Sequence, residues 1–263
     1  MTTKDTYDGY RAIAGVYDRL NAEIDYEGWA DFVESCFARY LIKKPTLLLD
    51  LACGTGSMTL ALAERGYDMI GVDGSMDMLS VAYERKAERG ADGVLLLCQD
   101  MRYFELYGTV GAVTCCLDSI NYLLTPQDVK RCFGCVHNYL DPDGIFLFDV
   151  NTPYKFRHIY GDQAYILEDL DENGEGRAFC GWQNFYDEST RLCTFDLSLF
   201  ERCEDGRYER TDERQTERCY EREELCRYLE QTGFEVIGCF GGWDFSAPLQ
   251  NCERYYFVAR CKK

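Results

Sequence analysis

A carboxylate and two glycines stand together where a short apolar run, LLLDLA, gives way to a helix-like stretch, SMTLALAERG. Asp50 lies in the apolar run, and Gly54 and Gly56 follow it closely. At a turn from strand to helix, glycines let the main chain approach a ligand, because they have no Cβ. A carboxylate at this place repels a pyrophosphate. The stretch therefore favours a cationic ligand without phosphate, or a carboxylate that supports the loop itself.

The glycine string departs from the phosphate-binding motifs. It lacks the third glycine of the dinucleotide fingerprint and the Gly-Lys-Ser/Thr of a phosphate-cradling loop. Two further acids end the next two apolar runs, since Asp73 closes DMIGVD and Asp100 closes GVLLLCQD. Taken alone, each acid is equally well an exposed carboxylate at a strand end. Three acids at three successive strand ends indicate one ligand site, because such ends meet at one edge of a parallel sheet.

Alternating strands and helices must position these acids. Each short apolar run is followed by a stretch with apolar residues at three- and four-residue spacing, which is typical of a parallel sheet wrapped by helices. Ser75 is suited to begin one helix, and Gly66 and Gly90 to end two of them. The sequence predicts strands at 46–52, 68–73, 93–100, 111–118, 145–151, 234–242 and 254–262. It predicts helical regions at 5–44, 57–66, 75–90 and 220–233, and a helix followed by a turn at 125–144.

The pattern changes between residues 161 and 220. Turn-like segments, DENGEGR and CEDGRY, flank a run with alternating apolar residues, RLCTFDLSLF, so an antiparallel insert is predicted rather than another crossover. In YERTDERQTERCY, glutamates and arginines each recur every four residues. This period fits a helix face, but it also fits a strand with arginines on one side and glutamates on the other. The preceding Asp-Gly turn favours the strand, whose polar residues form either an exposed face or one wall of a polar pocket.

The order of these motifs resembles the cofactor-binding half of class I S-adenosylmethionine-dependent methyltransferases. That family shows an acid, a small residue and Gly-x-Gly, and then a second acid at the end of the next strand. Asp50, the segment 52–56 and Asp73 match this order, with Ala52 where the family more often has glycine. VDGSMDML matches the family's Asp-x-Ser-x-x-Met-Leu pattern, and the last two strands resemble the hairpin that ends its sheet. The ligand that the resemblance implies is a sulfonium cation without phosphate.

The resemblance also implies roles for individual residues. Asp50 and the glycine loop hold the methionyl end, Asp73 accepts hydrogen bonds from the ribose hydroxyls, and Asp100 accepts one from the adenine amino group. Met78 and Leu117 enclose the ring. The implied binding site for S-adenosyl-L-methionine consists of Tyr17, Asp50, Ala52, Cys53, Gly54, Gly56, Asp73, Gly74, Met78, Asp100, Met101 and Leu117.

Candidates for the acceptor side follow the fourth and fifth predicted strands, where a substrate enters such a sheet. Asp118 either orients an amine and takes a proton, or caps the next turn. His158 is either a base or an ordinary surface or core histidine. No metal is required, because the sulfonium is already activated. The candidate catalytic residues are Asp118, Tyr122, Asn151 and His158.

Together these expectations describe a doubly wound, mostly parallel seven-stranded α/β fold. Residues 1–44 are expected to form an N-terminal helical lid, 45–160 and 221–263 the methyltransferase core, and 161–220 an antiparallel β insert that lies on the substrate side or at the contact of a homodimer. The predicted reaction moves a methyl group to an N or O atom of a small molecule. The alternatives are a NAD-dependent oxidoreductase, which requires the missing glycine, and a non-catalytic S-adenosylmethionine-binding protein.

Charge and cysteine usage narrow the class of protein. The net charge of −18 disfavours a nucleic-acid partner, because Lys and Arg supply most of the affinity for phosphate. Apolar runs too short for a membrane span and a start without a secretory pattern favour a cytoplasmic protein. The fifteen cysteines then act as small packing residues. Cys132 and Cys135 form a Cys-x-x-Cys pair, for which zinc binding or redox chemistry is the alternative.

Overall fold

The computed structural model describes residues 13–170, 174 and 176–263. Seven strands form one sheet in the order β10-β11-β5-β4-β1-β2-β3. β1 is parallel to β2 and β4, whereas β11 is antiparallel to both β5 and β10. The predicted doubly wound sheet with a final antiparallel hairpin is confirmed. The strands are β1 (Leu47–Leu51), β2 (Asp68–Asp73), β3 (Val94–Cys98), β4 (Val110–Cys115), β5 (Leu140–Asn151), β10 (Phe234–Phe240) and β11 (Arg254–Cys261).

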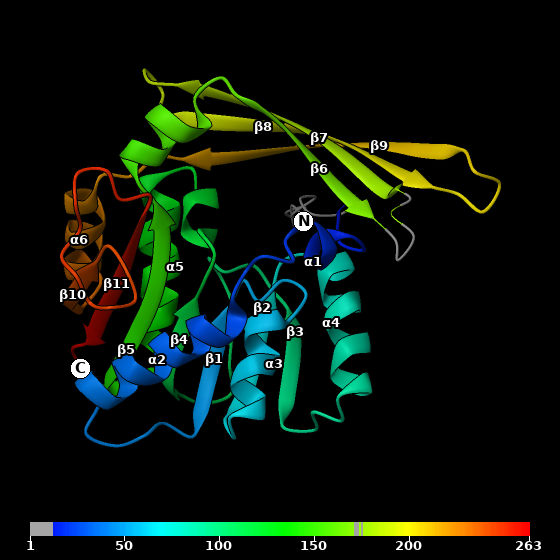
Figure 1. The fold of residues 1–263 in the computed structure, drawn as a ribbon. Coiled ribbons are helices and arrows are strands. Elements are labelled where there is room, and N and C mark those ends of the chain that lie inside the picture. The colour runs from blue at the N-terminus through cyan, green and yellow to red at the C-terminus, as the bar shows by residue number, and fades with distance from the viewer. Residues whose placement is uncertain (1–12, 171–173, 175) are drawn as a thin grey trace, which may run out of the picture.

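Helices cover both faces of this sheet (Figure 1). One face packs against α2 (Tyr26–Tyr40), α3 (Ser57–Glu64) and α4 (Met76–Glu88). The other face packs against α5 (Pro126–Tyr139) and α6 (Arg222–Gln231). Strands that are buried on both faces lose the alternation of polar and apolar residues, which is why their sequences are nearly continuous apolar runs.

Local signals fix where the helices begin. The side chain of Ser75 accepts a hydrogen bond from the Met78 N–H at the start of α4, and Thr125 accepts one from the Asp128 N–H at the start of α5. Gly66 adopts a φ of +87° just after α3, a conformation that glycine takes without strain. Ser75 and Thr125 thus mark where two helices begin, and Gly66 marks where α3 ends before β2.

A second sheet is formed by β6 (Ala164–Leu170), β7 (Gly176–Asp187), β8 (Leu192–Arg202) and β9 (Tyr208–Arg218), which are antiparallel in this order. This insert sheet lies across the carboxyl edge of the seven-stranded sheet (Figure 1). YERTDERQTERCY is therefore strand, as the Asp-Gly turn indicated.

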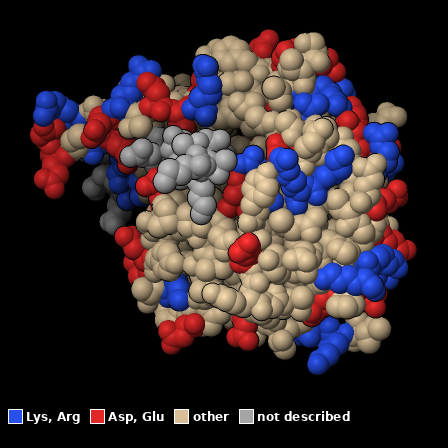
Figure 2. Space-filling view, turned by 180° about the vertical axis from the view of Figure 1, so that it is seen from behind, with Lys and Arg blue, Asp and Glu red and all other residues tan. Residues whose placement is uncertain are grey.

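One end of the insert sheet projects beyond the rest of the molecule and carries both acidic and basic side chains (Figure 2). Arg207 pairs with Asp205 there, and Arg210 pairs with Asp212. One face of the insert sheet is apolar, and it packs on Ile13 and on the buried ring of Phe156.

The N-terminal region differs from the helical expectation. Residues 1–12 lie outside the described part of the chain, residues 13–16 form a turn, and α1 (Tyr17–Leu20) is a single short helix before α2. The short α1 is consistent with the poor helix propensity of Gly15. A six-residue π-helical segment, η2 (Lys155–Tyr160), follows β5 and was not predicted. No helix within the described residues has the length and apolar character needed to cross a membrane.

Candidate active site

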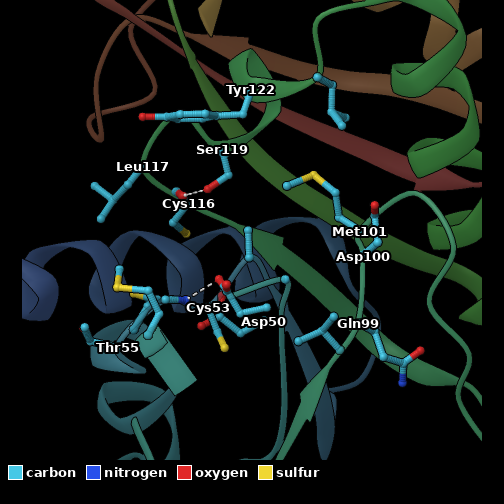
Figure 3. A pocket seen from close by; sticks show the side chains of 18 of the residues that line it. Asp50, Cys53, Thr55, Gln99, Asp100, Met101, Cys116, Leu117, Ser119 and Tyr122 are labelled. Carbon is cyan, nitrogen blue, oxygen red and sulfur yellow. Dashed lines mark hydrogen bonds between the residues drawn. The ribbon is translucent and has the colours of Figure 1, made fainter. Parts of the chain in front are cut away.

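A cavity of about 480 Å³ opens at the carboxyl ends of the first four core strands. Figure 3 shows Asp50 and Cys53 on one side of it and Tyr122 on the opposite side, with Met101 between them. The structure thus brings together every residue predicted for the cofactor except Gly56. The predicted residues that line the cavity are Tyr17, Asp50, Ala52, Cys53, Gly54, Asp73, Gly74, Met78, Asp100, Met101, Leu117 and Tyr122.

The glycine loop is shaped by three residues with left-handed backbone. Ala52 has a φ of 58° and Gly54 a φ of 55°. Gly56 adopts a φ of 78° and does not line the cavity; a Cβ there would lie 3.2 Å from the Cβ of Ala82. Gly56 therefore allows α3 and α4 to approach closely, and the resemblance alone had assigned it to the ligand.

Asp50 lies at the floor of the cavity, with its side chain held by two hydroxyls. Thr59 donates a hydrogen bond of 2.5 Å to one carboxyl oxygen, and Thr114 donates one of 2.9 Å to the other. Only 1% of Asp50 is exposed, and this burial raises its pKa to about 6. A carboxylate in this position makes the floor of the cavity negative at neutral pH.

This raised pKa predicts that binding of S-adenosyl-L-methionine weakens as the pH falls through 6. Protonation of Asp50 removes a negative charge that favours the cationic ligand. A bound cation that lowers the pKa by one unit gives about a fivefold loss of affinity between pH 7 and pH 5. Titration calorimetry across this range measures it, and Asp50→Asn is expected to show a smaller pH dependence. If the affinity of the wild type and of Asp50→Asn changes equally with pH, the assignment of Asp50 is wrong.

Asp73 joins the glycine loop to the start of α4. One of its carboxyl oxygens accepts a hydrogen bond of 2.8 Å from the Gly54 N–H, and the other accepts one of 2.8 Å from the Ser75 N–H. Each carboxylate oxygen has a second lone pair. Asp73 therefore keeps acceptor capacity for the two hydroxyls of a ribose while it holds both loops in place.

Asp100 has a basic partner that the sequence did not suggest. The Arg102 guanidinium donates to both of its carboxyl oxygens, with Nε at 2.9 and 3.0 Å. Burial raises the pKa of Asp100, but these bonds outweigh it and hold the pKa below its usual value. Arg102 lines the cavity and also lies 3.7 Å from Asp128. The carboxylate predicted for the adenine amino group is thus shared with an arginine.

A polar network ties α1 to the glycine loop. Arg85 of α4 contacts Asp18 at 2.7 Å and the Ser57 hydroxyl at 2.7 Å. Thr55 donates a hydrogen bond of 2.9 Å to the other carboxyl oxygen of Asp18. Because Tyr17 precedes Asp18 and lines the cavity, this network sets the position of that wall.

Replacing Arg85 with leucine is therefore expected to weaken cofactor binding. Its hydrogen bonds to a carboxylate and a hydroxyl contribute about 1–2 kcal/mol to holding α1, or roughly fivefold to thirtyfold in affinity. Calorimetry with S-adenosyl-L-methionine measures the loss. Arg89→Leu is the control, since Arg89 is on the same helix and pairs with the exposed Glu64. If both variants bind alike, the network does not support the site.

The charged residues that line the cavity fit S-adenosyl-L-methionine and not a phosphate-bearing cofactor. Asp50, Asp73, Asp100 and Asp128 line it, whereas Arg102 is the one basic side chain among its described lining residues. A pyrophosphate would meet four carboxylates here and a single arginine, which is already paired with Asp100. A cationic nucleoside can bind here to the carboxylates and the glycine loop, and its base can pack against the apolar side chains that line the cavity.

The candidate acceptor residues are not all at the cavity. Tyr122 lines it, and its hydroxyl donates a hydrogen bond of 2.9 Å to Gln215 of β9. Asp118 does not line the cavity itself, but Leu117 and Ser119 on either side of it do, and its side chain is 17% exposed. Asn151 is fully buried behind it, with its backbone N–H bound to the side chain of Asn121.

His158 is set apart from this group. It lies on η2, its side chain is exposed, and its ring lies 4.8 Å from that of Tyr154. It does not line the cavity, so we do not retain it as a candidate base. Its position follows from the unpredicted π-helical segment η2, which turns it towards the surface.

The backbone at Asp118 is strained. Leu117 and Asp118 adopt φ values of 60° and 55°, which residues other than glycine rarely take. Such strain costs about 1–3 kcal/mol a residue and occurs where the surrounding structure holds a functional geometry. Here the Asp118 N–H donates a hydrogen bond of 3.0 Å to the buried Asp149. The strain supports a role for this segment at the acceptor side.

The cysteines near the site are packing residues by their surroundings. Burial raises the pKa of Cys53, Cys115 and Cys116 well above the usual value, so the thiols stay protonated at neutral pH. Cys132 and Cys135 lie on α5, and burial raises the pKa of both. Within the described ranges, no cluster of histidine, cysteine or acidic residues is arranged to hold a metal ion.

Comparisons with known proteins identify the family. The sequence profile of a methyltransferase domain matches residues 48–144. A relative from Geobacillus sp. (strain WCH70), named as a methyltransferase, is 32% identical over 95% of this chain and 99% of its own length. The crystal structure of a S-adenosylmethionine-dependent methyltransferase from Clostridium acetobutylicum ATCC 824 is similar with a TM-score of 0.83 and 30% identity, covering 97% of this chain and 99% of that one.

The chain belongs to the class I S-adenosylmethionine-dependent methyltransferases. The predicted family, fold and cofactor are confirmed, and the oxidoreductase alternative is set aside. A further relative of this methyltransferase is the glycine/sarcosine N-methyltransferase of Halorhodospira halochloris, which is 25% identical over 95% of this chain and 88% of its own length.

Proposed function

We propose that this methyltransferase transfers the methyl group of S-adenosyl-L-methionine to the nitrogen of a small amine. The observation that carries the proposal is the carboxylate of Asp118, whose neighbours in sequence, Leu117 and Ser119, line the cavity. It is ionised, and it belongs to a backbone segment held in a strained conformation. The name of the Halorhodospira relative, a glycine/sarcosine N-methyltransferase, supports an amine acceptor.

The charge state of Asp118 supports this role. Burial raises its pKa, but the neighbouring Arg254 and Lys155 cations outweigh burial and hold the pKa below its usual value. Arg254 Nη1 lies 2.8 Å from the carboxylate. An ionised carboxylate of fixed orientation accepts hydrogen bonds from an amine and aligns its lone pair, and orientation of this kind contributes up to about 7–11 kcal/mol to barrier lowering.

The cofactor supplies a methyl group on a sulfonium, which is open to in-line displacement. Asp50 and the glycine loop would hold its methionyl end, Asp73 its ribose, and Asp100 with Met101 its base. Tyr17 and Tyr122 close the cavity towards the insert sheet. Since the leaving group is already activated, the residues of the chain need to orient the acceptor and exclude water.

A panel of matched acceptors tests the proposal. Purified protein is incubated with labelled S-adenosyl-L-methionine and glycine, sarcosine, a 3-amino sugar, or the hydroxyl analogue of each, and the formation of S-adenosylhomocysteine is followed. We expect turnover of at least one amine and its loss by more than tenfold in Asp118→Asn. Turnover of hydroxyl compounds alone, or an amine reaction indifferent to Asp118→Asn, overturns the proposal.

A further inference from the structure

A glutamate of the insert sheet lies against the acceptor-side carboxylate of the core. Glu217 is on β9 and only 3% of it is exposed. Side chains alternate along this strand, so that Gln215 and Glu217 point inward while Arg214 points to solvent and pairs with Asp196. The glutamate side of this end of the strand thus faces the core, although no described residue of β9 lines the cavity itself.

The contacts of Glu217 join two parts of the chain that are distant in sequence. Asn151 Nδ2 donates a hydrogen bond of 3.1 Å to Glu217 Oε2. The side chains of Glu217 and Asp118 are also hydrogen-bonded to each other. Two carboxyl groups in such contact cannot both be ionised, because like charges at this distance repel strongly where water is absent. One of the two holds a proton.

The surrounding charges decide which of the two is protonated. Asp118 has Arg254 beside it, and Arg254 also contacts the buried Asp149. Glu217 has no arginine at its carboxyl group among the described contacts, and burial together with the Asp118 carboxylate raises its pKa well above the usual value. The polar and titratable groups that face Glu217 from the packed elements are Asp118, Asn151, Lys155, Tyr160 and Cys193.

We propose that Glu217 is a positioning residue of the acceptor site: its carboxyl group stays protonated and donates a hydrogen bond to the Asp118 carboxylate, so that the insert sheet fixes the orientation of that carboxylate. The assignment of Asp118 to the acceptor rests on the proposed function. The hydrogen bond from Glu217 does not, because it follows from two buried carboxyl groups in contact. In this arrangement the insert sheet acts on the acceptor side through Asp118, whereas the described residues that line the cavity come from α1, α2 and the core.

The link depends on pH in a defined direction. The hydrogen bond from Glu217 is intact below the pKa of Glu217 and is lost as the pH rises through that pKa, because two carboxylates then face each other. Reaction with an amine is therefore expected to fall at alkaline pH. Glu217→Gln keeps a donor that does not titrate, and it is expected to remove this alkaline decline.

Carbon-13 NMR of protein labelled at the glutamate carboxyl groups tests the link without an acceptor. We expect one glutamate signal of the wild type to remain that of a protonated carboxyl at pH 7, to vanish in Glu217→Gln, and to titrate at lower pH in Asp118→Asn. Glu209→Gln is the control, since Glu209 lies on the same strand and is exposed. If every glutamate of the folded protein is ionised at pH 7, the proposal is wrong.

Kinetics with an amine that reacts in the panel test the consequence. The KM of Glu217→Gln for the amine is expected to stay within about threefold of the wild-type value, whereas the KM of Glu217→Ala is expected to rise roughly tenfold or more. The affinity for S-adenosyl-L-methionine is expected to be unchanged in both variants. Equal KM values for the alanine variant and the wild type overturn the positioning role. If no amine reacts, the proposed function fails, while the NMR result still decides whether Glu217 holds its proton.

Discussion

Replacing Arg254 with methionine is expected to lower the free energy of unfolding by about 3–5 kcal/mol at pH 7. Arg254 of β11 lies 2.8 Å from Asp118 and also contacts Asp149, whose side chain is fully buried. Methionine keeps most of the side-chain volume but leaves two carboxylates without their cation. Removing one partner of a buried ion pair is costly because the remaining charge is neither hydrated nor paired. Urea unfolding followed by circular dichroism measures the loss.

The pH dependence of this variant identifies the cause. Without Arg254 the pKa of Asp118 in the folded protein rises above its value in the unfolded chain, and the pKa of Asp149, which burial already raises, rises further. Such groups destabilise the fold while the unfolded chain is ionised, and the penalty disappears as the pH falls towards 4. Arg260→Met is the control, because Arg260 is on the same strand and its guanidinium donates to the carbonyl of Tyr40. The explanation is wrong if Arg254→Met loses the same free energy of unfolding at pH 7 and at pH 4, or if Arg260→Met loses as much as Arg254→Met.

The second large effect concerns the cofactor. Asp73→Ala is expected to weaken binding of S-adenosyl-L-methionine by about 2–4 kcal/mol, which is roughly thirtyfold to several hundredfold. The variant loses the acceptor proposed for the ribose hydroxyls. It also frees the N–H groups of Gly54 and Ser75, which both donate to this carboxylate. Titration calorimetry on the folded variant measures the change.

Two further substitutions make the result specific. Asp77→Ala removes an exposed carboxylate from the first turn of α4 and is expected to leave the affinity unchanged. Asp73→Asn keeps an oxygen acceptor for one loop but loses the charge, so its affinity is expected to lie between those of the alanine variant and the wild type. A folded Asp73→Ala protein with wild-type affinity refutes the assignment.

Much of the fold was predictable because it depends on local signals. The apolar runs within β1 to β4 are short and bounded by caps and glycines, and their alternation with helical periods indicates a parallel sheet. β5 begins at Leu140 and not at residue 145 as predicted, because residues 140–144 extend the strand and do not form only a turn. The start of α4 at Ser75 and the turn at Gly66 were located from single residues. The N-terminal region was less predictable from the sequence, because the helical period there did not show that α1 is only one turn long.

The cofactor side of the site was predictable for a related reason. Asp50, Asp73 and Asp100 follow consecutive strands, and the sheet brings such ends together whatever the rest of the chain does. Arg102, Arg85 and Glu217 were missed because their importance depends on partners that packing supplies. Arg85 meets Asp18 across 67 positions of sequence, for example, and the spacing of residues does not encode that contact.

The apolar side of the insert sheet has a consequence for how this chain tolerates change. Its cluster joins β7 and β8 residues such as Phe195 to Ile13, Val16 and Phe156, and no strand of the seven-stranded sheet contributes a buried residue to it in the described part of the chain. Tyr17 packs against the same cluster and also lines the cavity, so the cluster reaches the cofactor through this one ring and not through the interior of the core. Substitutions in the cluster are therefore expected to change the affinity for the methyl donor only when they displace Tyr17.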